Sequence, residues 1–173
     1  MYDPRIHHRQ STRLRGYDYA KAGLYFITIC CHNRLCLFGD VVGGMMILND
    51  AGKNADDCWM EIPAHFPNVT LHEYVIMPNH VHGIIELIGG GVGVKNISPL
   101  HRHPRSPSKT IGSIVRGYKI GVTKWFRNNT DVQNVWQRNY YDHIIRDENS
   151  FEKISAYIRN NPSKWDDNKF CLK

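Results

Sequence analysis

Two histidines one residue apart, His80 and His82, have the spacing of a metal-binding pair. Alternate side chains of a β-strand project from the same face, so on a strand the two imidazoles would lie about 7 Å apart along the chain. Imidazoles in that arrangement can share one divalent metal ion. The chain has 10 histidines, so a chance pair on a sheet surface is the competing interpretation. A second pair, His101 and His103, lies among Gly, Pro and Ser residues, and we interpret it as solvated.

A nucleophile and a third metal ligand would lie together at Tyr157 and Asn161. Residues four apart are neighbours on a helix surface, so a helix through this segment presents both side chains at one place. From the residues alone, a tyrosine at the edge of a buried stripe is usually a packing residue, and Tyr140 and Tyr141 are competing nucleophiles. The stripe beside Tyr157 consists of Phe151, Ile154 and Ile158.

These residues stand in two specific strings, MPNHVH at 77–82 and YIRNNP at 157–162. Two further segments accompany them in order, ICCHN at 29–33 and VWQRNYYDHIIR at 135–146. Together the four segments resemble the REP-associated tyrosine transposases, which belong to the single-tyrosine His-hydrophobe-His (HUH) superfamily. The resemblance covers about residues 19–165, which is nearly the whole chain.

The resemblance implies a ferredoxin-like antiparallel sheet with packed helices and a DNA-strand transferase activity. It implies that His80, His82 and Asn161 hold a divalent ion, Mg²⁺ or Mn²⁺, and that Tyr157 is the nucleophile. It further implies a substrate of single-stranded or hairpin DNA and a covalent 5′-phosphotyrosine intermediate. Some relatives have Gln in place of Asn161, and the shorter Asn amide still offers a carbonyl oxygen to a metal.

Two other classes of protein compete with this interpretation. The histidine-triad nucleotide hydrolases carry H-x-H-x-H on a strand, but the third position here is Ile84. A domesticated, non-catalytic hairpin-binding protein would keep the fold without turnover. Because His80, His82, Tyr157 and Asn161 are all intact, the sequence favours an active enzyme.

The charge distribution points to a polyanionic partner. The net charge is +6 and the sequence pI is about 9.1, which biases a small protein toward nucleic acid. No acidic residue occurs between Glu86 and Asp131, and this interval contains Lys95 and seven further Lys and Arg residues. Cations without counter-charges favour a phosphate-facing segment. The residues predicted to bind nucleic acid are Arg102, Arg105, Lys109, Arg116, Lys119, Lys124 and Arg127.

The chain is predicted to be one α+β domain over 21–173, preceded by a basic arm at 1–20 and interrupted by a flexible basic loop at about 89–108. The predicted strands are 24–33, 69–77 and 80–88, with a weaker one at 41–48 that Gly43 and Gly44 break, and an irregular or strand-like stretch at 135–147. The predicted helices begin at Asn49, at about Lys109 and at Asn149, and the last ends before Pro162.

The remaining composition indicates a reducing, cytoplasmic setting, with association to the nucleoid expected from the DNA partner. The five cysteines are odd in number and form no C-x-x-C pair, which argues against a disulfide framework and a zinc knuckle. No stretch approaches the roughly 18 apolar residues that a membrane helix needs, and no secretory signal is recognisable. The choice between a monomer and a homodimer stays open.

Overall fold

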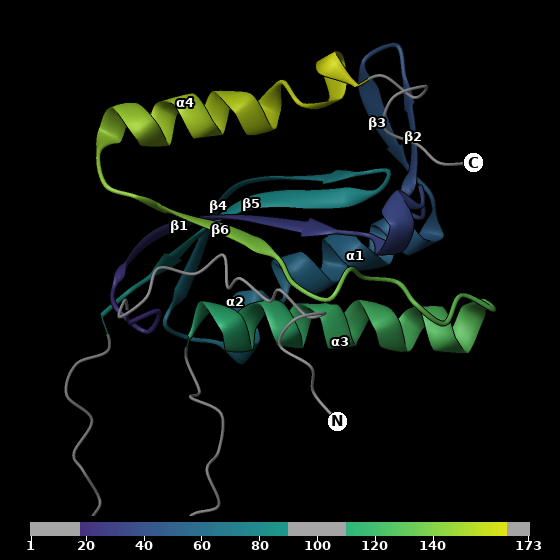
Figure 1. Cartoon of the computed structure of the whole chain (residues 1–173), viewed down its shortest axis with the longest axis horizontal. Coiled ribbons are helices and arrows are strands. Elements are labelled where there is room, and N and C mark those ends of the chain that lie inside the picture. Colours follow the sequence, from purple (N-terminus) through teal and green to yellow (C-terminus); the bar gives the residue numbers. More distant parts are fainter. Residues whose placement is uncertain (1–17, 90–109, 166–173) are drawn as a thin grey trace, which may run out of the picture.

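The computed structural model describes residues 18–89 and 110–165, which form an antiparallel sheet between two helical layers (Figure 1). The sheet has the strand order β4-β5-β1-β6. Its strands are β1 (Gly23–Cys30), β4 (Val69–Met77), β5 (His80–Leu87) and β6 (Tyr141–Ile145). One face is covered by α1 (Asp50–Met60), α2 (Ile62–His65) and α3 (Ile111–Asn129), and the other by α4 (Glu148–Arg159).

The topology is that of a ferredoxin-like fold. Taken along the chain, the sheet strands and the two long helices of one face follow the order β1-α1-β4-β5-α3-β6. This is the β-α-β-β-α-β arrangement, in which the first and third strands lie side by side in the centre of the sheet. The predicted α+β class with an antiparallel, ferredoxin-like sheet is therefore confirmed.

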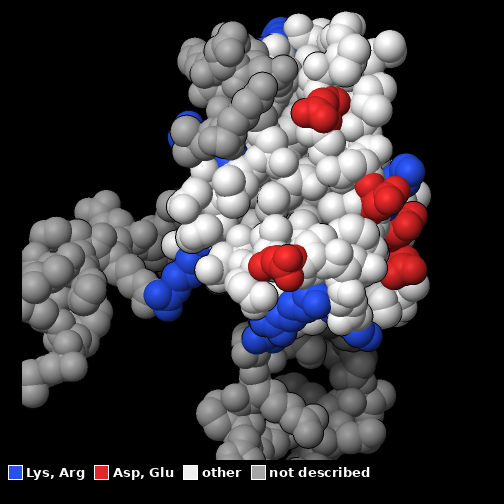
Figure 2. Space-filling model, turned by 90° about the vertical axis from the view of Figure 1, so that its right-hand side faces the viewer, with Lys and Arg blue, Asp and Glu red and all other residues white. Residues whose placement is uncertain are grey.

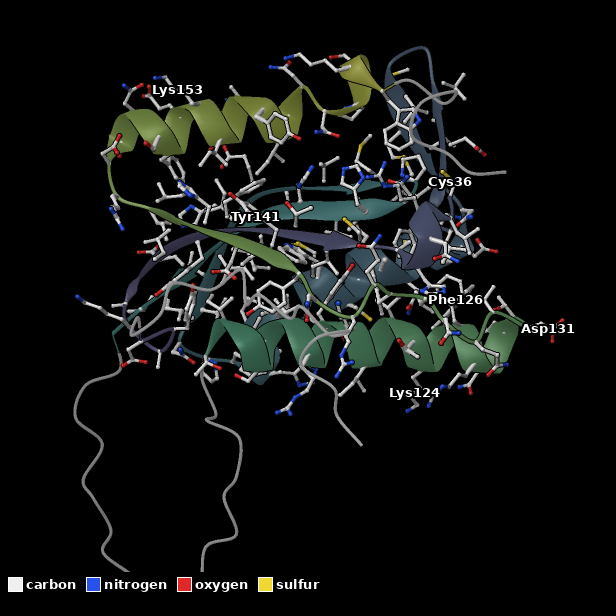
Figure 3. All side chains as sticks on the ribbon, viewed as in Figure 1. Cys36, Lys124, Phe126, Asp131, Tyr141 and Lys153 are labelled. Atoms are coloured by element: carbon white, nitrogen blue, oxygen red, sulfur yellow. The ribbon has the colours of Figure 1, made fainter. Side chains whose placement is uncertain are left out.

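The main core lies between the sheet and the α1–α3 layer. On β1 the side chains of Tyr25, Ile27 and Ile29 are fully buried and alternate with partly buried ones, as expected for a strand covered unequally on its two faces. On α3 the buried aromatic residue near the C-terminal end is Phe126. Figure 3 shows Phe126 directed toward the sheet and Lys124 directed away from it.

A smaller core on the other sheet face holds α4 in place. Its buried members are Ile84 on β5, Ile145 on β6 and Ile158 on α4. Leu24 and Phe26 of β1 pack against them. The helix that carries the predicted nucleophile is thus fixed over the sheet face that carries His80 and His82.

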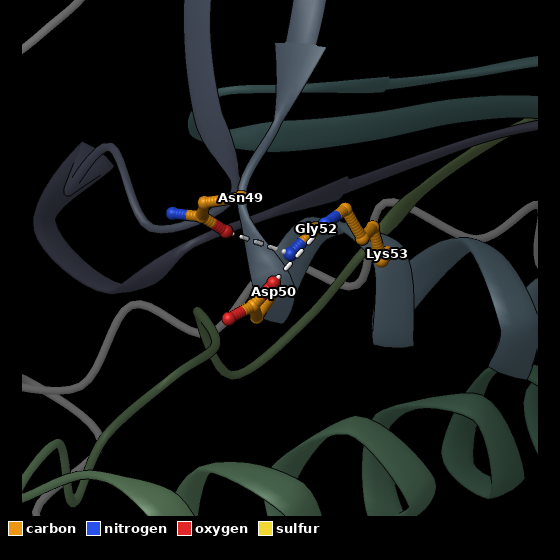
Figure 4. A network of polar contacts seen from close by, with 4 residues as sticks. All are labelled: Asn49, Asp50, Gly52 and Lys53. Atoms are coloured by element: carbon orange, nitrogen blue, oxygen red, sulfur yellow. Dashed lines mark hydrogen bonds and ion pairs between the residues drawn. The ribbon is translucent and has the colours of Figure 1, made fainter.

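Two helix starts agree with the sequence prediction. Asn49 precedes α1, and its side-chain oxygen accepts a hydrogen bond of 2.9 Å from the Gly52 N–H (Figure 4). In the same turn Lys53 pairs with Asp50 at 3.1 Å. Thr110 caps α3, close to the predicted start at about 109.

The start of α4 was predicted wrongly. Asp147 is its N-cap, and the Asp147 carboxylate accepts a hydrogen bond of 2.8 Å from the Ser150 N–H. Asn149 lies inside the first turn. Both residues are good caps by type, and the helix starts at the earlier one because β6 ends at Ile145, which leaves Asp147 in extended backbone directly before the helix.

Two strand predictions also change. The stretch 41–48 is the end of a hairpin of β2 (Gly39–Val42) and β3 (Met45–Leu48), turned by Gly43 and Gly44 at φ +59° and +77°. The strand expected to reach residue 33 ends at Cys30 and is followed by a 3₁₀ turn, η1 (His32–Arg34). Residues 1–17 of the arm predicted at 1–20, and the basic loop predicted at about 89–108 except for Gly89, lie outside the described residues.

The cysteines of the described segments are mostly free thiols. Cys30, Cys31 and Cys58 are unpaired, whereas Cys36 is disulfide-bonded. The odd number of cysteines argued against disulfides, and for Cys36 that expectation was wrong. Within 18–89 and 110–165, no helix combines the length and the apolar character that a membrane crossing requires.

Gly83 follows His82 on β5 and faces the main core, and we predict that Gly83→Ala destabilises the protein by about 1–3 kcal/mol. An added Cβ would lie 2.2 Å from Trp59 Cζ2. The Trp59 ring has no room to yield, because it is 1% exposed and packs at 5.8 Å on Tyr74 and 5.3 Å on Tyr118. Thermal and denaturant unfolding measure the change.

The matched control is Gly117→Ala on α3, where the added Cβ would meet Phe66 at an ordinary 3.4 Å. This change should leave stability unaltered or raise it by up to about 1 kcal/mol, since alanine is the better helix former. Equal stability of the Gly83→Ala variant and the unchanged protein would contradict the packing argument.

Candidate active site and basic groove

His80 and His82 project from the same face of β5, toward α4. In the register with β1, His80 is opposite Cys30 and His82 is opposite Thr28. The two imidazole centroids are 4.4 Å apart, which is closer than their separation along the strand because the rings converge. The sequence therefore placed the pair correctly on one sheet face.

Hydrogen bonds to the Nδ1 atoms orient both rings. Nδ1 of His80 lies 2.7 Å from the side-chain oxygen of Asn79, and Nδ1 of His82 lies 2.8 Å from the hydroxyl of Thr28. An amide oxygen can only accept, so Nδ1 of His80 carries the proton and Nε2 carries the lone pair. The same tautomer of His82 lets Nδ1 donate to Thr28. Such partners fix the ring orientation of metal-binding histidines in other proteins.

Burial keeps both imidazoles neutral. It lowers the pKa of His80 to about 4, although a hydrogen bond with the Asn161 side chain raises that pKa slightly. Burial lowers the pKa of His82 to about 3, and the neighbouring His80 contributes to the decrease. A neutral imidazole at neutral pH is the form that binds a metal ion.

The end of α4 brings Tyr157 and Asn161 to the two histidines. The Tyr157 hydroxyl lies 3.3 Å from Nε2 of His82, and the two rings meet at 5.3 Å between centroids. Asn161, one turn later, hydrogen-bonds with His80. Tyr157 is 46% exposed, so its hydroxyl is accessible to a ligand. The four predicted residues therefore lie together, as the helical spacing indicated.

A carboxylate on β4, which the sequence did not single out, fixes this part of α4. Glu73 accepts a hydrogen bond of 3.3 Å from the Ser155 hydroxyl and one of 2.7 Å from the Arg159 guanidinium. These two donors lie two residues before and two residues after Tyr157, and Ser155 is 2% exposed. The β4–β5 register shifts between Leu71 and Tyr74, beside Glu73. A sequence pattern does not reveal such a shift.

The four residues line one cavity of about 390 Å³, here called the tyrosine cavity. Its other lining residues are Thr28, Cys30, Arg34, Asn79, Lys164 and Trp165. Among residues 18–89 and 110–165, no Asp or Glu lines it, and these residues contain no cluster of three or more His, Cys, Asp and Glu that could hold a metal. A metal here would therefore be held by two imidazoles and the Asn161 amide. This mixed nitrogen and oxygen set suits Mn²⁺ and can accept Mg²⁺.

The competing tyrosines lie elsewhere. Tyr141 is exposed on the edge strand β6, where it faces the α4 side of the sheet and packs edge-on against Phe26 at 6.4 Å (Figure 3). Tyr140 lines a different depression, on the other side of the sheet. Neither residue lines the tyrosine cavity, which Tyr157 does.

That second depression, here called the α3 groove, has a volume of about 770 Å³. It lies between the outward face of α3 and residues 138–140. Among the described residues, no Asp or Glu lines it, and five cations do: Arg116, Lys119, Lys124, Arg127 and Arg138. Figure 2 shows Lys and Arg along the lower part of the described surface, at the level of α3. The other predicted nucleic-acid contacts, Arg102, Arg105 and Lys109, lie outside the described residues.

Lys119 has a structural task within the groove. Its ammonium donates to the carbonyl oxygens of Gln137 at 2.8 Å and Asn139 at 2.9 Å, so two of its three donors are used. Burial lowers the pKa of Lys119 to about 8. Arg138 was missed by the sequence prediction, because it follows Asp131, where the interval without acidic residues ends.

Comparisons with known proteins agree with this architecture. No protein-family model matches the chain. A protein of Haemophilus influenzae, described as uncharacterized, is 51% identical over 175 residues, covering 99% of this chain and 97% of that protein. The structure of a REP-associated tyrosine transposase bound to a REP hairpin matches with a TM-score of 0.61 and 21% identity, over 88% of this chain and 73% of that chain. A candidate transposase of Deinococcus radiodurans R1 matches with a TM-score of 0.48 and 17% identity, over 86% of this chain and 95% of that chain.

We predict that Glu73→Gln loosens the end of α4 without unfolding the protein. A neutral amide makes a weaker hydrogen bond with Arg159 than a carboxylate does, and an exposed ion pair contributes only about 0–1 kcal/mol to global stability. Amide hydrogen exchange around Ala156–Asn160 should accelerate severalfold, while exchange in β1 and β5 stays unchanged.

The matched control is Glu86→Gln. Glu86 is also a partly exposed carboxylate on the sheet, but its partner is His72 on β4 at 2.9 Å. This variant should leave exchange at the end of α4 as in the unchanged protein. Equal exchange in both variants would show that Glu73 does not hold the helix.

Proposed function

We propose that this chain, which belongs to the family of the Haemophilus influenzae protein and has the fold of a REP-associated tyrosine transposase, is a metal-dependent DNA-strand transferase. Its substrate would be single-stranded or hairpin DNA, a proposal supported by the REP hairpin bound in the transposase structure. The observation that carries the proposal is the Tyr157 hydroxyl, 3.3 Å from His82 Nε2 on a helix that also brings Asn161 to His80.

The reaction would be a transesterification at phosphorus. The Tyr157 oxygen forms a bond to the phosphorus atom, and the bond between phosphorus and the 3′ oxygen breaks. One proton leaves the tyrosine hydroxyl and one ends on the 3′ oxygen, so the products are a 5′-phosphotyrosine and a free 3′-OH. The phosphotyrosine conserves the bond energy of the phosphodiester, so rejoining needs no nucleotide cofactor.

The cavity residues have separate tasks in this reaction. His80, His82 and Asn161 would hold the divalent ion, and their neutral ligand set leaves the ion its full positive charge. A bound ion polarises the phosphoryl group and neutralises developing negative charge. Asn79 and Thr28 keep the two rings in register. Glu73 keeps Tyr157 over His82 through Ser155 and Arg159 on either side of it.

The α3 groove would bind the phosphates of the folded part of the DNA. Lys124 and Arg127 are exposed there, and no acidic residue of the described segments lines the groove. Phosphate contacts give affinity without reading sequence, and binding then falls as salt displaces the protein.

We predict that Tyr157→Phe abolishes covalent capture of a labelled DNA hairpin with single-stranded flanks. The change removes one oxygen and preserves the ring packing, so hairpin affinity should stay within about twofold. The adduct of the unchanged protein should require Mn²⁺ or Mg²⁺ and disappear with a chelator. Denaturing electrophoresis detects the adduct.

Tyr141→Phe and Tyr140→Phe are the controls, and both should retain the adduct. Peptide mapping of the adduct to a residue other than Tyr157 would refute the assignment of the nucleophile. Hairpin binding by the unchanged protein with no adduct under any metal condition would instead favour a non-catalytic binding protein.

We predict that Lys124→Gln together with Arg127→Gln flattens the salt dependence of hairpin binding. The slope of log K against log salt should fall by about 0.7–0.9 for each DNA phosphate that the variant no longer neutralises. Lys119 is left intact, because it holds residues 137–139 in place. Binding titrations over a range of salt concentrations measure the slope.

The charge-matched control changes Lys53 and Lys153 to Gln. Lys53 lies on α1 and Lys153 on the outer side of α4 (Figure 3), and neither lines the α3 groove. The control should keep the original slope. Identical slopes in the groove variant and the control would place the DNA on another surface.

A further inference from the structure

The tyrosine cavity contains a cation, Arg34, to which the proposed reaction assigns no task. Within the described residues, no Asp or Glu forms an ion pair with Arg34, and none lines the cavity. Burial raises the pKa of the Cys30 thiol in this cavity, and the positive charge of the Arg34 guanidinium opposes part of that rise. A guanidinium in an acid-free cavity is suited to an anionic ligand.

The backbone that carries Arg34 is strained. Asn33 and Arg34 both have left-handed φ angles, +50° and +56°, although neither is glycine. A non-glycine residue in this region costs of order 1 kcal/mol or more, and such residues cluster at ligand-binding sites. The Cys31 N–H donates to Asn79 O at 2.8 Å, and the His32 N–H donates to Val135 O at 2.9 Å. These bonds hold the turn against β5 and against the segment that precedes β6.

One buried side chain links this turn to the proposed metal site. The Asn79 amide nitrogen donates to the Arg34 backbone oxygen at 3.3 Å, and the Asn79 amide oxygen accepts from His80 Nδ1 at 2.7 Å. Asn79 is 6% exposed, so this amide is fixed by packing. The position of Arg34 and the orientation of His80 are therefore set by the same group.

We infer that Arg34 binds a phosphate of the DNA strand that occupies the tyrosine cavity, and that the strained turn aims its guanidinium at that phosphate. The inference rests on the proposed function for its ligand, a phosphodiester anion. A guanidinium presents a planar fork of donors that matches two phosphate oxygens. Arg34 is thus a substrate-binding residue that lies beside the nucleophile rather than in the α3 groove.

The test removes one charge from the protein and one from the DNA. Single phosphates of the labelled hairpin are replaced, one position at a time, by neutral methylphosphonates, and affinity is measured in a Tyr157→Phe background that cannot react. Replacement of the phosphate that Arg34 contacts should weaken binding about ten- to a hundredfold, the range for a charge-assisted hydrogen bond. With Arg34→Gln added, the same replacement should change affinity by less than about twofold.

Two variants serve as controls. Gln carries the same cost of a left-handed backbone as Arg, so Arg34→Gln should fold normally, and its thermal unfolding checks this. Arg34→Lys should keep sensitivity to the same methylphosphonate, although less of it, because an ammonium lacks the planar fork. Lys153→Gln removes one charge outside both cavities and should leave the whole methylphosphonate profile unchanged.

An identical methylphosphonate profile with and without Arg34 would overturn the inference, whether or not the unchanged protein forms an adduct. A profile in which Arg34→Gln abolishes the sensitivity at one position supports it, even if the protein forms no covalent adduct and the proposed transferase activity fails. The two failures are therefore distinguishable, because affinity reports on Arg34 and adduct formation reports on Tyr157.

Discussion

The alternation of side chains on β5 is the constraint on which the rest of the structure depends. Val81 and Gly83 face the main core, whereas His80, His82 and Ile84 face α4. Gly83 is necessary because Trp59 packs where its Cβ would be. The central strand β5 therefore places two imidazoles on one face of the sheet, while Val81 and Gly83, which alternate with them, remain packed against the main core on the other face.

The helix α4 covers only part of the sheet face that carries the two histidines. The imidazoles therefore line a cavity beside the helix. Ile158 anchors the helix in the smaller core, and Tyr157 before it and Asn161 after it line the tyrosine cavity. Burial keeps the two imidazoles uncharged. The hydrogen bond at each Nδ1 satisfies that buried polar atom and fixes the orientation of the ring. Burial and these hydrogen bonds thus prepare the rings as neutral ligands of fixed orientation.

Short-range periodicity explains what the sequence predicted correctly. A period of two placed His80 and His82 on one face, and a spacing of four placed Tyr157 beside Asn161. The α+β arrangement followed from the order of strands and helices. Glu73 escaped prediction because its partners are more than 80 residues away and its direction depends on a register shift. The cap of α4 was misplaced because Asp147 and Asn149 are both suitable by type, and only the end of β6 decides between them.

The two candidate DNA surfaces lie on opposite sides of the sheet, and the chain joins them along one edge. Residues 135–137 run beside the end of β1, where the Gln137 N–H donates to Cys30 O at 2.9 Å and Trp136 forms a bridge with Cys31. Cys30 lines the tyrosine cavity, and Lys119 of the α3 groove holds the carbonyl of Gln137. Under the proposed function, DNA that occupies both sites can pass around this edge. A hairpin with a single-stranded flank can follow such a path, because its flexible flank bends where a continuous duplex resists bending.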